Sequence, residues 1–387
     1  MQYRRFGKLD WEVSALGFGC MRFPTVGGES SNIDEPEATK MLHYAIDHGV
    51  NYVDTAYPYH GGNSELVVGR ALKGGYREKV KLATKLPCWK PEAYEDFDKI
   101  LNEQLEKLQT DHIDFYLLHA LNEKNWHKVR DLDVLAWAEG ALADGRISYL
   151  GFSFHDEYAV FQEIVDAYDE WTFCQIQYNY MDVNNQAGTK GLKYAASKGL
   201  AVVIMEPILG GRLVAPPQSI QDLWDTAEKK RTPADWALQW LWNQPEVSVV
   251  LSGMSTMEQV VQNVASAEAS GIDILTPEDL ALVEQVREKY QELCPIPCTQ
   301  CEYCMPCPNG VNIPRNFEIY NEGVMYDKPD QSRKAYDWLS EDKRASACIQ
   351  CLECEEKCPQ SIPISEWMPF VHEVLGEGKP YSECPLP

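Results

Sequence analysis

Short apolar runs alternate with amphipathic stretches along roughly the first 275 residues of this 387-residue chain. In the amphipathic stretches apolar residues recur at helical spacing, as in Pro36–His48, Ala93–Leu108 and Lys124–Asp144. Strands that alternate with helices pair in parallel, and eight of them predict a closed (β/α)8 TIM barrel. We expect the eight strands at Leu16–Cys20, Asn51–Ala56, Val80–Lys85, Ile113–His119, Ser148–Ser153, Phe173–Asn179, Ala201–Glu206 and Val247–Gly253.

Further elements flank the predicted barrel. Tyr3–Phe6 and Glu12–Val13 predict a small hairpin before the first strand, and Pro277–Glu292 predicts a last helix. Beyond that helix, Ile313–Gly323 and Pro329–Arg344 show helical spacing within a cysteine-rich segment. We therefore expect a barrel domain at residues 1–275, a connecting helix at 276–293 and a mainly helical domain at 294–387.

Ionisable residues stand where three neighbouring strands are predicted to end. These are Asp54, Lys85 and His119, and barrel enzymes place their chemistry at the C-terminal ends of strands. Lys85 shares a strand face with Ala83, and a buried lysine needs a charged partner, so we expect it to pair with Asp54 on the adjacent strand. A lone histidine there is more often structural. Three ionisable residues at the same end of adjacent strands instead indicate an active site.

Two cysteine runs near the end of the chain give the most specific signal. They read Cys298-x2-Cys301-x2-Cys304-x2-Cys307-Pro308 and Cys348-x2-Cys351-x2-Cys354-x3-Cys358-Pro359. This spacing is typical of cubane iron–sulfur clusters, in which the fourth cysteine of each run ligates the other cluster. Zinc is the alternative, but it usually takes two CxxC pairs with a long spacer between them. We expect two [4Fe-4S] clusters, one on Cys298, Cys301, Cys304 and Cys358 and one on Cys348, Cys351, Cys354 and Cys307.

Charge and cysteine usage narrow the class of protein. Asp and Glu number 59 against 35 Lys and Arg, and the net charge of −24 disfavours nucleic acid and anionic membranes as partners. We expect no membrane span and no signal peptide in the start MQYRRFGKLD. Free thiolates and oxygen-labile clusters point to a reducing cytosol, so we expect a cytoplasmic protein. The cysteines outside the cysteine-rich segment lie in apolar stretches typical of core positions: Cys20, Cys88 and Cys174.

The residues at the strand ends also carry a family resemblance. Asp54-Thr55-Ala56-Tyr57-Pro58-Tyr59, with Gly62, Ser64, Glu65, Gly69 and Leu72 after it, resembles the first signature of the aldo-keto reductases. Ala83-Thr84-Lys85, the segment from Asp114 to His119 and Gly151-Phe152-Ser153 are similar to the family's other motifs. The resemblance implies an NAD(P)-dependent oxidoreductase that reduces a small aldehyde or ketone.

The resemblance also implies catalytic roles for Asp54, Tyr59, Lys85 and His119. Tyr59 would give a proton to the carbonyl oxygen, and His119 would hydrogen-bond that oxygen. Carbonyl reduction develops an alkoxide, so a positioned acid and aimed donors are what the chemistry needs. A tyrosine ordinarily titrates near pH ~10, and Lys85, held by Asp54, would lower the pKa of the phenol.

The same resemblance implies a nicotinamide across the barrel mouth. Phe154 replaces a usual asparagine, and Gly253 and Gln259 replace basic residues that often hold a 2′-phosphate. The 2′-phosphate of NADPH is an extra dianion, and without a cation beside it the main attraction for it is lost. The choice between NADH and NADPH therefore stays open. The implied cofactor residues are Gly19, Cys20 and Met21, then Ser153 and Gln175 at the carboxamide, Met205 in place of a stacking aromatic, Pro207, Gly211 and Leu213 after strand seven, and Gly253, Gln259 and Asn263 at the adenosine phosphate.

Residues 294–387 resemble the ferredoxin-like extension of some bacterial and archaeal aldo-keto reductases. Their halves form a weak repeat, PCTQCEYCMPCPNGVNIP against ACIQCLECEEKCPQSIPI. The first run is one residue short before its last cysteine, so either Cys294 or Cys298 shares a role or the loop is tighter. Cys384 has no assigned partner.

Three functional hypotheses remain from the sequence. The first is a carbonyl-reducing enzyme whose clusters exchange electrons with a redox carrier such as ferredoxin or flavodoxin. The second is an electron-transfer or redox-sensing protein that uses the barrel as a docking platform, and the third makes the clusters purely structural. The four catalytic residue types favour the first, while Phe154 and Met205 keep the second open. Hydride carries two electrons and each cluster passes one, so no complete path between them is predicted.

Overall fold

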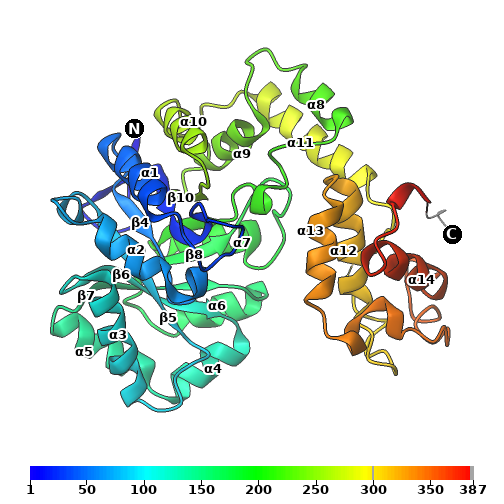
Figure 1. The fold of residues 1–387 in the computed structure, drawn as a ribbon, viewed down its shortest axis with the longest axis horizontal. Helices are drawn as coiled ribbons and strands as arrows, with labels where there is room; N and C mark the ends of the chain where they lie inside the picture. The colour runs from blue at the N-terminus through cyan, green and yellow to red at the C-terminus, as the bar shows by residue number, and fades with distance from the viewer. Residues whose placement is uncertain (299, 384–387) are drawn as a thin grey trace. The chain divides into compact units, whose positions relative to one another are not determined.

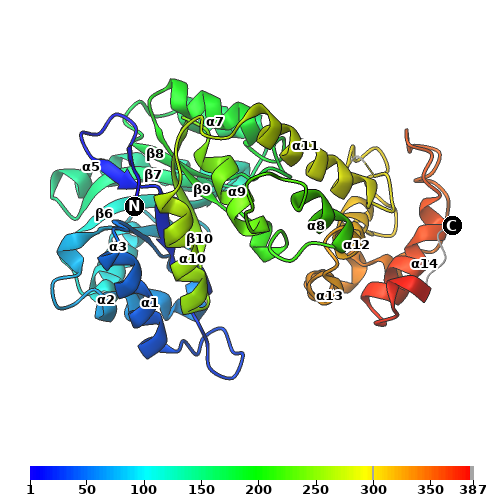
Figure 2. The ribbon, with the colours of Figure 1, turned by 90° about the horizontal axis from the view of Figure 1, so that it is seen from above.

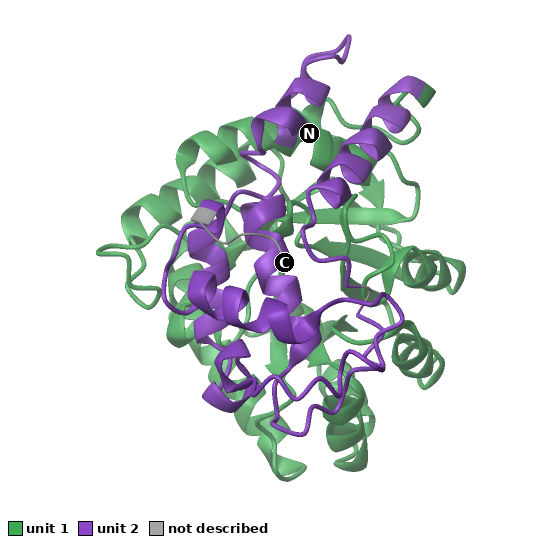
Figure 3. Ribbon diagram, turned by 90° about the vertical axis from the view of Figure 1, so that its right-hand side faces the viewer, with its two compact units in different colours: residues 1–210, 234–277 green, residues 211–233, 278–387 purple. Residues whose placement is uncertain are grey.

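The computed structural model describes residues 1–298 and 300–383. They form two compact units: unit 1 comprises residues 1–210 and 234–277, and unit 2 comprises residues 211–233 and those from 278 onward (Figure 3). The domain boundaries expected at residues 275 and 293 stay a proposal. None of the helices in the described part of the chain combines the length and apolar character that a membrane span requires.

Unit 1 is built on a closed barrel of parallel strands (Figures 1 and 2). Within the described residues the barrel has eight strands, which follow one another from β3 to β10 until β10 pairs with β3. The predicted TIM barrel is confirmed, and every strand overlaps an expected one. The strands are β3 (Leu16–Gly19), β4 (Tyr52–Asp54), β5 (Lys81–Pro87), β6 (Ile113–Leu121), β7 (Ile147–Phe154), β8 (Phe173–Gln177), β9 (Ala201–Met205) and β10 (Val247–Gly253).

Helices surround these strands in both ribbon views (Figures 1 and 2). Three of them begin at side chains that satisfy a free backbone N–H: Asp34 accepts from Glu37, Asn122 from Asn125, and Thr256 from Gln259. The helices are α1 (Glu35–Asp47), α2 (Ser64–Ala71), α3 (Glu95–Leu108), α4 (Glu123–Asp131), α5 (Val134–Ala143), α6 (Tyr158–Asp166), α7 (Gly188–Ser197), α9 (Pro233–Trp242) and α10 (Met257–Glu268).

Apolar side chains fill the inside of the barrel. The predicted hairpin is present as β1 (Tyr3–Arg5) and β2 (Glu12–Ser14), and Phe6 and Val13 pack against the first residues of the barrel strands. Because strand side chains alternate between faces, residues two positions beyond this core also face inward. The inward-facing apolar residues are Tyr52, Ala83, Phe115, Leu117, Phe173, Ala201, Val203, Val249 and Leu251.

Most predicted strand ends are off by one or two residues, and two of these differences bear on the site. β5 continues to Pro87 and β6 to Leu121, so Lys85 and His119 lie inside strands rather than at their last residue. The pairing of β5 with β6 extends over these positions, with Lys85 opposite Leu117 and Pro87 opposite His119.

Two predicted helices are also shorter than expected. The stretch from Lys124 to Asp144 is divided into α4 and α5, because Asp133 adopts a left-handed conformation with φ 62°. The helix expected over 329–344 ends at Asp337. Arg344 folds back on that end and donates to the carbonyl oxygens of Asp337 at 2.7 Å and Leu339 at 2.9 Å.

Unit 2 is mainly helical, as predicted. Six cysteines of the two runs pack against its apolar core, which includes Phe317, Tyr320 and Trp367. The segment 211–233 joins this unit through Arg212, which pairs with Glu322 at 2.7 Å. The helices are α8 (Gln218–Trp224), α11 (Pro277–Glu292), α12 (Ile313–Met325), α13 (Pro329–Asp337) and α14 (Ile364–Leu375).

Candidate active site and cysteine centres

One inward-facing residue from each barrel strand forms a layer at the C-terminal ends of the strands. Each lies two positions beyond an apolar core residue or beyond Gly17 or Gly151, where an added Cβ would meet barrel-core side chains. Every member was singled out from the sequence, and the barrel gathers them at one end. The layer consists of Gly19, Asp54, Lys85, His119, Ser153, Gln175, Met205 and Gly253.

Lys85 and Asp54 form the buried ion pair that the sequence predicted. Lys85 Nζ lies 2.6 Å from Asp54 Oδ1 and also donates to the carbonyl oxygen of Thr55 at 2.8 Å. Burial lowers the pKa of Lys85, but the carboxylate of Asp54 and the oxygen of Tyr59 outweigh it, so the pKa lies above its usual value. A permanently charged ammonium therefore stands in the layer.

Tyr59 lies beside this ammonium, on the turn after β4. Lys85 Nζ is 5.1 Å from the centre of the tyrosine ring. Burial raises the pKa of Tyr59, Lys85 lowers it and Asp54 raises it again, with a net pKa above the usual value. The expected effect of Lys85 is thus present but smaller than that of burial. The phenol keeps its proton at neutral pH and is available as an acid.

His119 faces Tyr59 from β6. Their ring centres are 6.1 Å apart and the rings are nearly perpendicular, while Trp89 lies 5.2 Å from the histidine on the other side. Burial, and then the charge of Lys85, holds the pKa of His119 well below its usual value. The ring is therefore neutral, with one N–H to donate. Its Nδ1 is buried and has no hydrogen-bond partner among the described residues.

A buried polar network supports Lys85 from behind, and the sequence did not predict it as a unit. Glu65, on α2, accepts from Thr84 and Gln104, each at 2.7 Å. Gln104 also donates to the backbone oxygen of Lys85 at 3.0 Å and accepts from Tyr116 at 2.7 Å. Glu65 and Thr84 belong to the motifs that carry the family resemblance, but nothing in the sequence analysis joined Gln104 to them.

Tyr57 is turned to a different network. Its hydroxyl donates to Glu103 at 3.1 Å and accepts from Lys90 at 2.7 Å. Tyr57 therefore matches Tyr59 in chemistry but not in contact with Lys85 and Asp54.

The residues expected at a nicotinamide carboxamide line the same layer. Gln175 Oε1 is buried and has no hydrogen-bond partner in the described part of the chain, and its amide nitrogen lies 3.7 Å from the sulfur of Met205. Ser153 Oγ accepts the backbone N–H of Ala120 at 2.8 Å, so its own proton is free to donate. An unsatisfied buried acceptor beside a free donor fits a carboxamide, which offers both an N–H and a carbonyl.

Phe154, where an asparagine was expected, faces away from this layer. It is fully buried and packs on Phe161 of α6, at a ring distance of 5.1 Å. The replacement of asparagine by Phe154 therefore lies in the core between the strands and the helices, and it removes no polar group from the barrel mouth.

Glycines stand in the layer on β3 and β10, where neighbouring atoms approach the backbone closely. Gly19 pairs with Asp54 on one side and Gly253 on the other, and a Cβ on Gly19 would lie 3.2 Å from the backbone oxygen of Ser252. The next residues differ, since Cys20 is fully buried and Met21 is 54 % exposed.

An arginine missed by sequence reasoning stands beside the expected phosphate segment. A Cβ on Gly253 would lie 2.7 Å from Cγ of Arg22, and Ser255 Oγ donates to the backbone oxygen of Arg22 at 2.8 Å. Arg22 is exposed. No local pattern connects residues 22 and 253, which meet because β10 pairs with β3.

The remaining residues of this segment hold its loop. Gln259 accepts from the backbone N–H of Ser255 at 2.7 Å, and Asn263 donates to Ser252 Oγ at 2.9 Å. Pro207 belongs to unit 1, whereas Gly211 and Leu213 belong to unit 2. Cofactor contacts from these residues stay predictions.

Four cysteines of unit 2 line one hollow. They come from both runs, since Cys307 joins Cys348, Cys351 and Cys354, together with Gln350 and Ser365. The charge of Cys307 acts on the thiol of Cys348, whose pKa is raised by burial and then by neighbouring thiolates. This is the crossed arrangement expected of two clusters, and four sulfurs are the donor set that a [4Fe-4S] cluster takes.

The other set is crossed in the same way. Burial and then the charges of Cys298, Cys301 and Cys358 raise the pKa of Cys304 to about 11, so Cys358 stands with the three cysteines of the first run. A bound metal ion deprotonates such a thiol outright. No three His, Cys, Asp or Glu side chains of the described residues are placed to hold a single metal ion.

Two further cysteines had no assigned role. Cys294 is half-buried, and its thiol donates to the backbone oxygen of Ile296 at 3.3 Å. Cys384 lies outside the described residues. The three cysteines expected in the core, Cys20, Cys88 and Cys174, are buried.

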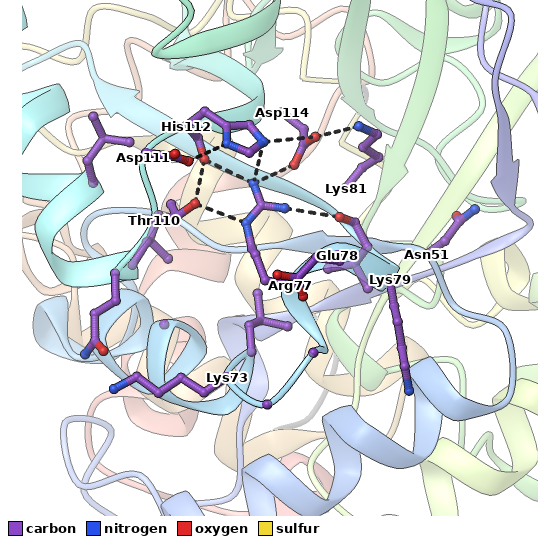
Figure 4. Close-up of a pocket in the computed structure, with 18 of the residues that line it drawn as sticks. Asn51, Lys73, Arg77, Glu78, Lys79, Lys81, Thr110, Asp111, His112 and Asp114 are labelled. Atoms are coloured by element: carbon purple, nitrogen blue, oxygen red, sulfur yellow. Dashed lines mark hydrogen bonds and ion pairs between the residues drawn. The ribbon is translucent and has the colours of Figure 1, made fainter.

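A hollow of about 930 Å³ lies at the opposite end of the barrel strands (Figure 4). Its charged groups pair with one another. Asp114 forms ion pairs with Arg77 and Lys81, each at 2.8 Å, and accepts a hydrogen bond from the backbone N–H of Leu82 at 2.9 Å. Burial raises the pKa of Asp114, but these partners hold it below its usual value. The cluster stabilises the starts of β5 and β6.

The sequence matches the Aldo/keto reductase family over residues 15–288. The chain belongs to this family. Relatives of the aldo/keto reductase include L-galactose dehydrogenase of Arabidopsis thaliana, 28 % identical over 320 residues, which cover 76 % of this chain and 96 % of the relative. An uncharacterized oxidoreductase of Bacillus subtilis, YqkF, is 26 % identical over 70 % of this chain and 92 % of its own.

Solved structures carry the same fold as this aldo/keto reductase. The holo form of aldo-keto reductase AKR11C1 from Bacillus halodurans has a TM-score of 0.62 and 27 % identity, covering 74 % of this chain and 96 % of its own. An aldo-keto reductase from Klebsiella pneumoniae, solved in complex with NADPH, has a TM-score of 0.58 and 24 % identity, covering 74 % of this chain and 95 % of its own.

The second unit has its own match. Residues 297–362 match a 4Fe-4S dicluster domain, and this span contains all eight cysteines of the two runs. The aldo/keto reductase therefore carries a ferredoxin-like iron–sulfur domain, and the zinc alternative is not supported.

Proposed function

We propose that this chain reduces an aldehyde or ketone, with a nicotinamide as the electron source and Tyr59 as the proton donor. One observation carries the proposal: the phenol of Tyr59 lies against an ammonium, Lys85, that Asp54 holds at 2.6 Å in a buried site. A docking platform has no need of a buried charge pair, which costs desolvation energy to form.

Each residue of the layer has a part in this reaction. The nicotinamide, when bound, supplies the hydride. Tyr59 gives its proton to the oxygen of the substrate as negative charge develops there, and the ammonium of Lys85 stabilises the phenolate left behind. The neutral ring of His119 donates a hydrogen bond to the same oxygen. Trp89, 42 % exposed and packed on His119, supplies an apolar wall at the mouth.

We infer that unit 2 holds two [4Fe-4S] clusters and that they exchange electrons with a carrier such as ferredoxin or flavodoxin. The two crossed cysteine sets support this count, because each offers four sulfurs. Oxygen-labile clusters suit a reducing compartment, so the proposed location is the cytoplasm.

An anaerobic screen of aldehydes and ketones with NADH and with NADPH tests the enzyme proposal. We expect Tyr59→Phe to lose carbonyl reduction by a factor of about 10²–10⁴, the usual contribution of a positioned acid, while its iron content stays unchanged. Tyr57→Phe is the matched control and should retain activity, since its hydroxyl contacts Glu103 and Lys90 instead.

Other results would support the docking-platform hypothesis. These are no turnover with any carbonyl compound, or equal activity in Tyr59→Phe and wild type, together with clusters that dithionite reduces. Bleaching of the cluster absorbance by NADH or NADPH would show that the two sites communicate.

A further inference from the structure

The two cysteine loops share left-handed backbone positions between residues 300 and 304 and between residues 350 and 354. Gln300 and Gln350 hold left-handed conformations with φ 55° and 57°, and Glu302 and Leu352 do so with φ 59° and 68°. The backbone N–H of Gln350 lies 3.4 Å from Cys348 Sγ. Gln300 stands two residues after Cys298, as Gln350 stands two residues after Cys348, and the two share one conformation. The described backbone of the two loops is thus matched at these positions.

The loops differ in one fixed carboxylate. After the third cysteine the first loop has Met305, and the second has Glu355. Glu355 Oε1 accepts from the backbone N–H of Ser365 at 2.7 Å and from its hydroxyl at 2.5 Å. When Cys307 is aligned with Cys358, Pro314 stands opposite Ser365 and has neither of these donors. Only the second loop therefore has this interaction.

The carboxylate is held close to the second cysteine set. Ser365, which binds it, is buried and lines the hollow with the four cysteines, and Gln350 donates to the backbone oxygen of Ser365 at 3.0 Å. Glu355 also follows Cys354 directly in the chain, so its charge lies beside this set. No cation pairs with Glu355 among the residues that the structure describes.

The first set has a carboxylate nearby, but a cation neutralises it. Glu318 acts on the thiol of Cys298, and Arg315 lies 2.6 Å from Glu318. Other glutamates of the loops, such as Glu302 and Glu353, are exposed, where solvent screens their charge. The unpaired, fixed charge of Glu355 is the main electrostatic difference between the sets.

We propose that Glu355 makes the cluster on Cys307, Cys348, Cys351 and Cys354 the lower-potential one of the pair. A negative charge beside a cluster disfavours the added electron, and net charge and hydrogen bonds to sulfur set cluster potentials. Because the backbone positions match, the charge of Glu355 decides the order. A single electron that enters the pair then resides on the cluster of Cys298, Cys301, Cys304 and Cys358. This inference rests on the proposed presence of two clusters.

An anaerobic redox titration of the full-length protein, followed by electron paramagnetic resonance, tests the inference. Eight irons per chain must be present first, and four would overturn both the two-cluster proposal and this inference. With eight, two separate midpoints are expected. Glu355→Gln should raise the lower midpoint and leave the upper one in place. The electron distribution between the clusters should change about tenfold or more, equivalent to about 59 mV for one electron.

Matched variants separate a local charge effect from a general one. Glu356→Gln removes a neighbouring exposed charge and should leave both midpoints within error of wild type. Met305→Glu, at the equivalent position of the first loop, should lower the upper midpoint. This variant tests the inference if Glu355→Gln loses iron. Equal shifts of the lower midpoint in Glu355→Gln and Glu356→Gln would overturn the inference. So would unchanged midpoints in both Glu355→Gln and Met305→Glu when eight irons are bound.

Discussion

Lys85 Nζ lies 2.6 Å from Asp54 Oδ1, and both side chains are almost completely buried. Asp54→Asn should destabilise unit 1 by about 3–5 kcal/mol, because an unpaired ammonium is left inside the barrel. It should also reduce carbonyl reduction, since Lys85 would no longer be held charged beside Tyr59. Urea unfolding and steady-state kinetics measure the two effects.

The exposed pair of Lys79 and Asp47 is the control for this variant. Its separation is 2.8 Å, but each side chain is about half exposed. Asp47→Asn should change neither stability nor activity noticeably. A similar loss of stability in Asp54→Asn and Asp47→Asn would mean that burial does not determine how much an ion pair contributes to stability.

The folding stability should depend on pH through His119. Its pKa is well below the usual value when folded and about 6.5 when unfolded, so the unfolded chain binds the proton first as the pH falls. The stability that the neutral ring contributes is present above about pH 6.5 and is lost below it. Between pH 6.5 and 5 the free energy of unfolding should fall by up to about 1.4 kcal/mol per pH unit.

His119→Gln should flatten this part of the stability curve. His127, whose side chain is 41 % exposed, provides the control, and His127→Gln should keep the wild-type slope. An unchanged slope in His119→Gln would assign the pH dependence to other groups.

Local patterns predicted most of the fold and the layer of polar residues. The strand period placed Lys85 on the face of Ala83, and burial then required the partner found in Asp54. The contact of Arg22 with Gly253 was not predictable, because it depends on barrel closure between residues far apart in sequence. The predicted lowering of the pKa of Tyr59 by Lys85 is present, but the larger effect of burial was not predictable, since burial depends on the whole barrel mouth.

Arg22 should favour NADPH over NADH. Its side chain lies against Gly253, in the segment where a 2′-phosphate is expected, and a charge-assisted hydrogen bond contributes about 1.5–3 kcal/mol. Arg22→Ala should raise KM for NADPH about tenfold or more and leave KM for NADH nearly unchanged. Equal effects on both cofactors would show that Arg22 does not read the 2′-phosphate.

Cys307 should belong to the second cluster despite its place in the first run. Cys307→Ser should alter the paramagnetic signal of the cluster on Cys348, Cys351 and Cys354 and leave the other signal intact. Cys358→Ser should do the reverse. If each variant instead altered the cluster of its own run, the crossed assignment would be wrong.

Deuterium transfer from a nicotinamide deuterated at C4 tests the central claim most directly, with any carbonyl compound that the screen finds. Direct delivery to a substrate held between Tyr59 and His119 should place one deuterium on the carbinol carbon of the product, as mass spectrometry would show. The hydroxyl proton should come from water through Tyr59. A carbinol carbon that carries solvent hydrogen instead would contradict the account, since the electrons would then have reached the substrate one at a time.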